Sequence, residues 1–461
     1  FGGNIYAENQ KVWEKTSKPN EPREFGYYIQ DQISYKGIII SPGLRLDLVD
    51  PNQDYRVASN TFIPITSDTG FTKASVKYQI SPRINIAYPI TDRSILSIAY
   101  GLYFKTPQYQ YMYDNFAQDI LRGGSPVGNP NLDAQRTNAY QVAYNQQFND
   151  VFALGVTAYY NDLYSQLGAT YIPASPTPFY IYSTSEYGNT RGIEFELRKQ
   201  PAGDHLLLVL NYTYSKVDGT APNPESNFGA PRDIYTDKFA FPLATYPQPW
   251  DLRHSLKGYV NFIWGRDEGP SIFGMKILQN ANINFTGSYR SGYPYTKTDK
   301  DGKLLGEYNA ERQPSFWTVS SRISKLFYLK DIVGESLGNT AIEFFVDIYN
   351  LFNRTVPTAV YSATGDPIDN GVTLNRRIGD FSSTPWYKEA SYNNPETFMS
   401  DQYDKFGNRF YNVNSDFDKN GVVTQSEKFE SYMKYVKTAL SFLGNYSAPR
   451  TIYAGFMIRF N

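Results

Sequence analysis

The stretch RGIEFELRKQPAGDHLLLVLNYTYSK, Arg191–Lys216, decides the fold. In its first half apolar and charged residues alternate, with Ile193, Phe195 and Leu197 on one face and Glu194, Glu196 and Arg198 on the other. After the turn-forming PAGD the alternation resumes, with an apolar face of Leu206, Leu208, Leu210, Tyr212 and Tyr214. A period of two indicates β-strands with two unlike faces, and the short turn between them indicates an antiparallel hairpin.

The same period recurs along the whole chain. SILSIAYGLYFK, SLKGYVNFIWG and TIYAGFMIRFN each place apolar residues at every second position. On this basis about thirteen strands are predicted, over residues 24–36, 38–49, 77–89, 94–105, 136–148, 151–163, 189–199, 205–217, 252–264, 278–290, 315–327, 339–352 and 450–461. The prediction is an all-β, antiparallel fold.

The connections between these strands alternate between short and long. Short turns are expected near Lys36, at Thr91–Arg93, at Asn149–Asp150 and at Pro201–Asp204. Long polar loops are expected over residues 51–76, 106–135, 164–187, 218–250, 291–314 and 353–448. This rhythm is typical of transmembrane β-barrels, which have short periplasmic turns and long extracellular loops. A soluble all-β protein is the alternative, and aromatic strand ends such as Tyr212 and Trp264 favour the barrel because they suit membrane interfaces.

The composition of the chain argues against several classes of function. The chain has 461 residues, no Cys and a net charge of −1. The missing basic excess argues against nucleic-acid binding, and the missing Cys excludes disulfides, thiolate metal sites and Cys nucleophiles. No apolar run reaches the ~18 residues of a spanning helix, but a spanning strand needs only ~10 residues with every second one apolar. A multi-pass β-barrel in contact with outer-membrane lipid is therefore the class of membrane protein that the sequence allows.

The segment DFDKNGVVTQSE, Asp416–Glu427, has the spacing of a calcium-binding loop. Its predicted ligands are Asp416, Asp418, Asn420, the Val422 carbonyl, Thr424 through a bridging water, and a bidentate Glu427. Gly421 allows the sharp turn at the sixth position, and SEKFESYMKYVKTALSFL predicts an exit helix. The entering segment is not clearly helical, so the pattern is half an EF-hand, and an acidic surface turn is the alternative. Calcium is expected to order the long surrounding loop, with an affinity of ~10⁻⁴–10⁻³ M.

Several stretches, taken in order, resemble TonB-dependent outer-membrane transporters. They are FGYYIQDQISYKG with SPGLRLDL, SPRINIAYPITDRSILSIAYGLYFKTP, NPNLDAQRTNAYQVAYNQQF, GVTAYYNDL, RGIEFEL, PWDLRHSL, SGYPYT and FFVDIYNLFNRT. Each piece is weakly specific, and their order and spacing together carry the resemblance. It covers nearly the whole chain apart from most of residues 355–448, and its style is closest to members from Bacteroidetes-like bacteria.

The resemblance implies a 22-stranded barrel with a plugged lumen, of which this chain would hold the last thirteen strands. The plug, the TonB-contacting box and the first strands are expected before Phe1. Residues 1–352 would supply barrel strands and loops, residues 353–448 an extracellular insertion, and residues 449–461 the closing strand. Phe460 is expected to serve as the aromatic assembly signal of the last strand.

The function that the resemblance implies is active uptake of a bulky nutrient such as a peptide, a glycan or a metal chelate. The implied partner is a TonB-type energy-coupling protein acting through the plug, with a surface lipoprotein or complex partner as a further possibility. The alternative is a structural or adhesive barrel that scaffolds a larger complex.

Other candidate residues are weaker. Tyr109, Tyr111 and Tyr113, in TPQYQYMYDNF, are candidates for stacking on a ligand, and loop packing explains them equally well. His205 and His254 are the only histidines. Few residues could therefore serve as the general base of a hydrolase, and no catalytic residue is assigned. Glu194 and Glu196 are interpreted as polar lining of a wet lumen.

Overall fold

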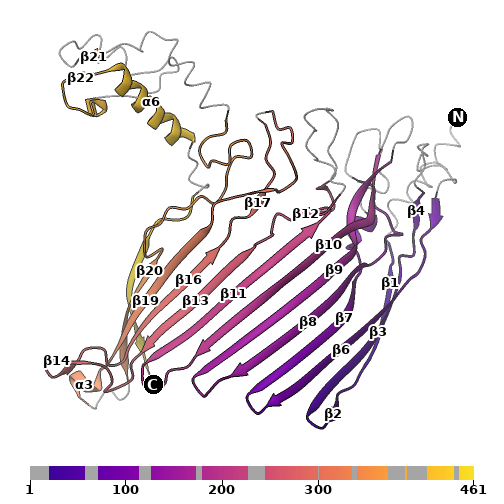
Figure 1. Ribbon diagram of the computed structural model, residues 1–461, viewed down its shortest axis with the longest axis horizontal. Coiled ribbons are helices and arrows are strands. Elements are labelled where there is room, and N and C mark those ends of the chain that lie inside the picture. Colours follow the sequence, from indigo (N-terminus) through magenta and orange to yellow (C-terminus); the bar gives the residue numbers. More distant parts are fainter. Residues whose placement is uncertain are drawn as a thin grey trace, which may run out of the picture.

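The computed structural model describes residues 20–57, 71–113, 126–172, 179–226, 244–299, 301–334, 340–371, 390–391, 413–440 and 446–460. Long antiparallel strands form one curved sheet, each paired with its neighbours in chain order (Figure 1). The strands are β1 (Arg23–Gln30), β3 (Ile38–Asp50), β6 (Lys77–Thr91), β7 (Ser94–Lys105), β8 (Gln135–Gln147), β9 (Phe152–Ile172), β10 (Phe179–Lys199), β11 (Leu206–Gly219), β13 (His254–Ile263), β16 (Ala281–Arg290), β19 (Phe316–Tyr328), β20 (Ala341–Tyr349) and β23 (Thr451–Arg459). Each of the thirteen predicted strands is present, so the predicted fold class is confirmed.

The shorter elements lie in the connections. They are β2 (Ile33–Tyr35), β4 (Asp54–Arg56), β5 (Phe71–Lys73), α2 (Tyr109–Tyr113), β12 (Tyr246–Pro247), β14 (Ser271–Ile272), β15 (Met275–Lys276), β17 (Pro294–Tyr295), β18 (Glu311–Arg312), α3 (Lys330–Val333), β21 (Ala390–Ser391), η4 (Val413–Ser415), β22 (Val422–Val423) and α6 (Gln425–Leu440). Figure 1 shows β2, β14 and α3 at one end of the sheet and β4, β12 and β17 at the other. We call these the turn end and the loop end.

Register gives the sheet one apolar and one polar face. Leu154, Leu197 and Leu210 stand opposite one another on neighbouring strands. Three positions away along β10, on the other face, Glu194 stands between Thr157 and Thr213. The apolar face is open to its surroundings, because Phe344 is 48% and Phe456 73% exposed. Such a face requires lipid, since a soluble wall would cover it with a second layer.

The loop predicted over residues 164–187 is wrong for most of its length. β9 continues to Ile172, and β10 begins at Phe179. Phe179 pairs with Ile172, so the two strands extend as a hairpin past the loop end of the neighbouring strands. The segment is rich in Tyr, Ile and Thr, which favour strands, and pairing with a neighbour outweighs its polar character. A register shift between Ser183 and Gly188 marks where the two strands leave the regular sheet.

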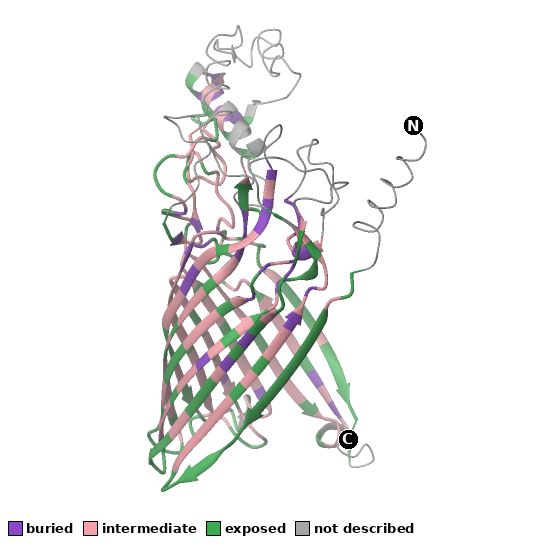
Figure 2. Cartoon of the chain, turned by 90° about the vertical axis from the view of Figure 1, so that its right-hand side faces the viewer, coloured by how far each residue is buried: buried purple, intermediate pink, exposed green. Residues whose placement is uncertain are grey.

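The buried apolar core lies at the loop end rather than behind the sheet. One cluster contains Val127, Phe179 and Ile181, and a second contains Met112, Leu132, Leu167 and Tyr182. Figure 2 shows many buried residues on the upper parts of the strands, while the wall below is mostly intermediate or exposed, with scattered buried residues. Within the described residues no helix combines the length and apolar character needed to cross a membrane.

Candidate functional site

The acidic loop Asp416–Glu427 folds around its own backbone amides. The Asp416 carboxylate accepts hydrogen bonds from the amides of Asn420 (3.1 Å) and Gly421 (2.9 Å). The Asn420 side-chain oxygen accepts from the Val422 amide at 2.8 Å. Gly421 has φ +87°, a conformation that favours glycine, as the sixth position of a calcium loop requires.

Three of the predicted ligands come together. Carboxylate oxygens of Asp416, Asp418 and Glu427 lie within 4.8 Å of one another, and Asp416 and Glu427 are buried. Three hard carboxylate donors at this separation are the chemistry that Ca²⁺ prefers. Asn420 also belongs to the cluster, because its side-chain amide donates to Asp418 at 2.9 Å.

Glu427 also caps the helix that follows the loop. Its carboxylate accepts from the amides of Phe417 (2.7 Å) and Thr424 (2.9 Å) and from the Thr424 hydroxyl (2.9 Å). The Glu427 amide in turn donates to that hydroxyl, which makes a capping box at the start of α6. Thr424 is thus engaged as a helix cap, and its predicted role of holding a bridging water stays a prediction.

The environment of Glu427 keeps it ionised. Burial by itself would raise the pKa of this carboxyl group, but the hydrogen bonds from Thr424, Phe417 and Asp418 outweigh burial and hold the pKa below its ordinary value. A carboxylate has about four lone-pair sites, so these donors leave little capacity for a cation. To bind a metal ion, Glu427 would therefore have to release some of the hydrogen bonds that it accepts from Thr424, Phe417 and Asp418.

The predicted exit helix is present as α6, and the described part of the entering segment, Val413–Ser415, is the 3₁₀ turn η4. Val422 and Val423 form β22, which pairs with Ala390 and Ser391 of β21. In paired calcium loops the central residues bond to a second loop. Here a distant part of the same insertion takes that place, which sequence spacing did not reveal.

Tyr109, Tyr111 and Tyr113, near the loop end, differ in how far their rings are free to stack on a ligand. Tyr113 donates to the Pro51 carbonyl at 2.8 Å, and burial raises its pKa to about 12. Tyr111 packs edge-on against Tyr182 with ring centres 5.0 Å apart. Tyr109 is 46% exposed, and its hydroxyl donates to Glu24 at 2.9 Å. Tyr109 is therefore the member of the set whose ring is most open to a ligand.

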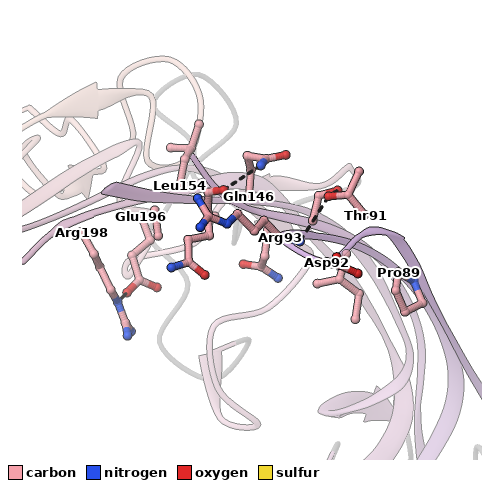
Figure 3. A pocket seen from close by; sticks show the side chains of 14 residues that line it. Pro89, Thr91, Asp92, Arg93, Gln146, Leu154, Glu196 and Arg198 are labelled. Carbon is pink, nitrogen blue, oxygen red and sulfur yellow. Dashed lines mark hydrogen bonds and ion pairs between the residues drawn. The ribbon is translucent and has the colours of Figure 1, made fainter. Parts of the chain in front are cut away.

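Two pockets border the polar face. At the turn end a pocket of about 490 Å³ is lined by Arg93, Gln147, Glu196 and Arg198 (Figure 3). Glu196 and Arg198 form an ion pair there, in agreement with a lining role for Glu196. At the loop end a pocket of about 570 Å³ lies beside β19, β20 and β23.

Sequence reasoning did not predict a buried carboxylate at the loop end that forms ion pairs with two arginines. The Asp251 carboxylate is fully buried, and it pairs with Arg253 at 2.7 Å and with Arg312 of β18. It also accepts from the Val217 amide at 2.8 Å. The signal available in the sequence was the motif PWDLRH, whose Asp and Arg are these residues, but the partner Arg312 lies 61 residues away.

The two histidines lie in different environments, His254 on a strand of the sheet and His205 beside a turn. His254 belongs to the apolar face, where its Nδ1 lies 2.9 Å from the Tyr212 hydroxyl. His205 borders the turn before β11, with Glu268 at 3.5 Å. Neither arrangement, in the described part of the chain, brings a Ser hydroxyl and a carboxylate onto the same imidazole as a hydrolase requires.

The open apolar face, the polar face and the two unlike ends together define an outer-membrane β-barrel wall. A family model described as "TonB dependent receptor-like, beta-barrel" matches residues 2–351. The chain belongs to this family, which is a family of transporters rather than of enzymes. No curated protein sequence matches the chain.

The chain is similar to several solved structures at low identity. The ferric-catecholate import receptor Fiu from E. coli K12 is 14% identical, covering 75% of this chain and 42% of its own, with a TM-score of 0.44. The FrpB iron transporter from Neisseria meningitidis is 13% identical, covering 77% and 46%, with a TM-score of 0.46. The siderophore receptor PiuA from Acinetobacter baumannii is 13% identical, covering 74% and 40%, with a TM-score of 0.47. The chain thus spans less than half the length of these proteins.

Proposed function

We propose that the protein takes part in active uptake of a bulky nutrient across the outer membrane. The observation that carries the proposal is the family match over residues 2–351 on a sheet with one lipid-compatible face. A ligand would bind at the loop end, and a TonB-type energy-coupling protein would act through a plug of the family type. A peptide, a glycan and a metal chelate are the candidate ligand classes, and Bacteroidetes-like bacteria are the proposed source.

The ligand would meet the loop end before the lumen. The exposed ring of Tyr109 offers a stacking surface there, while Tyr111 and Tyr113 would hold that surface in place. Residues 353–448 would form an extracellular insertion between the strands of residues 1–352 and the closing strand at 449–461. Phe460, which is 80% exposed beyond β23, would act as the assembly signal.

The uptake proposal can be tested without knowing the ligand. A strain lacking the gene and its parent are grown in one medium containing a protein digest, mixed polysaccharides and ferric chelates, and the spent media are compared by mass spectrometry. The expected result is a compound class that the parent depletes and the mutant leaves, with depletion restored by the full gene and abolished when TonB is absent. Identical spent media, with a stoichiometric partner bound to the protein, would instead support the scaffold function.

The insertion would bind calcium through Asp416, Asp418, Asn420, the Val422 carbonyl, Thr424 by way of a bridging water, and Glu427. Support comes from the loop spacing, from the three clustered carboxylates and from the exit helix α6. Because Glu427 must exchange hydrogen bonds of its cap, we expect weak binding, on the order of 10⁻⁴–10⁻³ M. Calcium would then stabilise the insertion at extracellular concentrations.

Calorimetric titration of the purified full chain with CaCl₂ tests this part. Glu427→Gln should weaken binding at least about tenfold, because it removes a charge while glutamine still suits the capping box. Asp301→Asn, in the acidic TDKDGK turn that has no spaced glutamate, is the matched control and should leave binding unchanged. Equal binding by the wild type and the Glu427→Gln variant would contradict the proposed ligand set.

A further inference from the structure

Two arginines at the loop end differ from most arginines of the sheet. Many of the others have a carboxylate partner, as in the pairs Arg45–Asp47, Arg191–Asp218, Arg322–Asp347 and Arg459–Glu343. Among the described residues, Arg354 and Arg450 have none within ion-pair distance. Their two positive charges are therefore not balanced by acids of the described chain.

Arg450 lies on the apolar face, at its loop-end boundary. Along β23, Ile452, Phe456 and Ile458 occupy one face, and Ile452 stands opposite Ile348 of β20. Arg450 precedes Ile452 by two positions, just before β23 begins, and so continues the same face toward the loop end. The apolar run from Phe460 to Ile452 spans nine residues, which is about what a tilted strand needs to cross the hydrocarbon layer. Arg450 thus falls at the depth of the lipid headgroups.

Arg354 reaches the same boundary through an aromatic contact. Its guanidinium lies over the Trp317 ring at 4.3 Å from the ring centre. Trp317 belongs to the apolar face of β19, and its ring contacts Phe352 edge-on at 5.8 Å. Tryptophan and arginine are common at the level of the headgroups, where one side is apolar and the other is polar. The stack holds the cation at this level.

A single turn connects the two arginines. The Asn350 side chain donates to the carbonyls of Arg354 and Ala448, both at 2.9 Å. The Asn353 side chain accepts from the Arg450 amide at 2.9 Å. These bonds use only backbone groups of Arg354 and Arg450, so both guanidinium groups keep their donors for another partner.

The stacked guanidinium also borders open space. The loop-end pocket of about 570 Å³ is lined by Trp317, Asn350, Arg354 and Pro449, together with residues of the polar face such as Tyr349. Arg354 is therefore not enclosed on every side by the described chain.

We propose that Arg354 and Arg450 bind the phosphate of an anionic lipid in the outer leaflet, with Trp317 and Phe352 packed beside its glycerol or sugar region. Guanidinium groups match phosphate in charge and in bidentate geometry, and the hydrogen bonds of the turn hold the backbones of Arg354 and Arg450 close to one another. The proposal needs only the barrel in its membrane and does not depend on the uptake function. The site would fix the barrel wall next to the root of the insertion.

The test is native mass spectrometry of the full chain in neutral detergent, titrated with dioleoyl phosphatidylglycerol or dioleoyl phosphatidylcholine. We expect the wild type to bind phosphatidylglycerol about tenfold tighter, because a charged hydrogen-bonded contact contributes ~1.5–3 kcal/mol and 1.4 kcal/mol is tenfold. Arg354→Gln with Arg450→Gln should remove this preference. Arg83→Gln is the matched control, since Arg83 also stacks over a ring, that of Tyr103 at 4.5 Å, but lies on the polar face.

Folding of each variant is checked by its heat-dependent migration on gels, and Arg450→Gln alone is used if the double variant does not fold. Equal binding of the two lipids by the wild type, or a preference that persists in the folded variant, would overturn the proposal. Competition by ~10 mM inorganic phosphate as strong as that by phosphatidylglycerol would also overturn it, because the site would then bind free phosphate rather than lipid.

Discussion

Replacing Asp251 with alanine removes the carboxylate that joins three loop-end segments. Asp251 lies just before β13, and its partner Arg312 lies in β18, beyond the β17–β18 loop. Arg312 also donates to the carbonyls of Asp251 (3.0 Å) and Gly292 (3.1 Å). This contact is therefore one of those that hold the loop between β16 and β19 to the rim of the sheet, together with the bond from Asn309 to the Pro247 carbonyl.

The expected cost follows from the burial of the three groups. Asp251 is fully buried, while the side chains of Arg253 and Arg312 are 24% and 29% exposed. Removing one partner of a buried pair costs about 3–5 kcal/mol, and the partial access of water to both guanidinium groups favours the lower value. About 3 kcal/mol corresponds to a rise of roughly 100-fold in the fraction of molecules whose loop is open.

Limited digestion with trypsin measures this opening. The rate of cleavage after Lys303, in the β17–β18 loop, is proportional to the open fraction when the loop recloses faster than it is cut. We expect cleavage to accelerate by roughly 100-fold in Asp251→Ala, up to the rate of an unstructured peptide. Asp150→Asn is the control, because its pair with Arg93 is exposed and an exposed pair adds almost nothing.

A cleavage rate in Asp251→Ala within about threefold of the wild-type rate would refute the reasoning, since 0.6 kcal/mol is far below the cost of a broken buried pair. Equal acceleration in Asp150→Asn would show that the assay reports general loosening of the barrel instead of this contact.

Three further predictions use the same physical arguments. Gly292→Ala should open the same loop in the trypsin assay, because a Cβ there would lie 1.5 Å from the Gln313 carbonyl oxygen, and an unchanged rate would contradict it. The pKa of Glu427 is lowered, so its capping of α6 should be complete above its ordinary pKa of 4.5 and be lost as pH falls below that value. Hydrogen exchange of the Thr424 and Phe417 amides, corrected for intrinsic rate, measures that loss between pH 6 and pH 3. Tyr113→Phe removes the bond to Pro51 and should cost about 1 kcal/mol locally, seen as roughly fivefold faster exchange across α2, whereas Tyr109→Phe, whose bond to Glu24 is exposed, should change it little.

The strands could be predicted because their signal is local. Alternation such as Ile193, Phe195 and Leu197 indicates which residues face lipid. In a barrel wall only one face of each strand is apolar, so the period of two stays clear in the sequence. The calcium-loop spacing is local for the same reason, and the clustering of Asp416, Asp418 and Glu427 follows from one tight turn.

The features that sequence reasoning missed depend on pairing between segments, in most cases between segments far apart in the chain. The extension of β9 and β10 depends on pairing of Ile172 with Phe179, which overrides a polar composition. The Asp251–Arg312 pair needs two loops brought together across the rim, and the site of Arg354 and Arg450 needs β19, β20 and β23 side by side. Period and spacing describe one segment at a time. Sequence alone therefore determined which residues form the wall and which face meets the membrane, and only the tertiary structure decided which distant side chains meet at its rim.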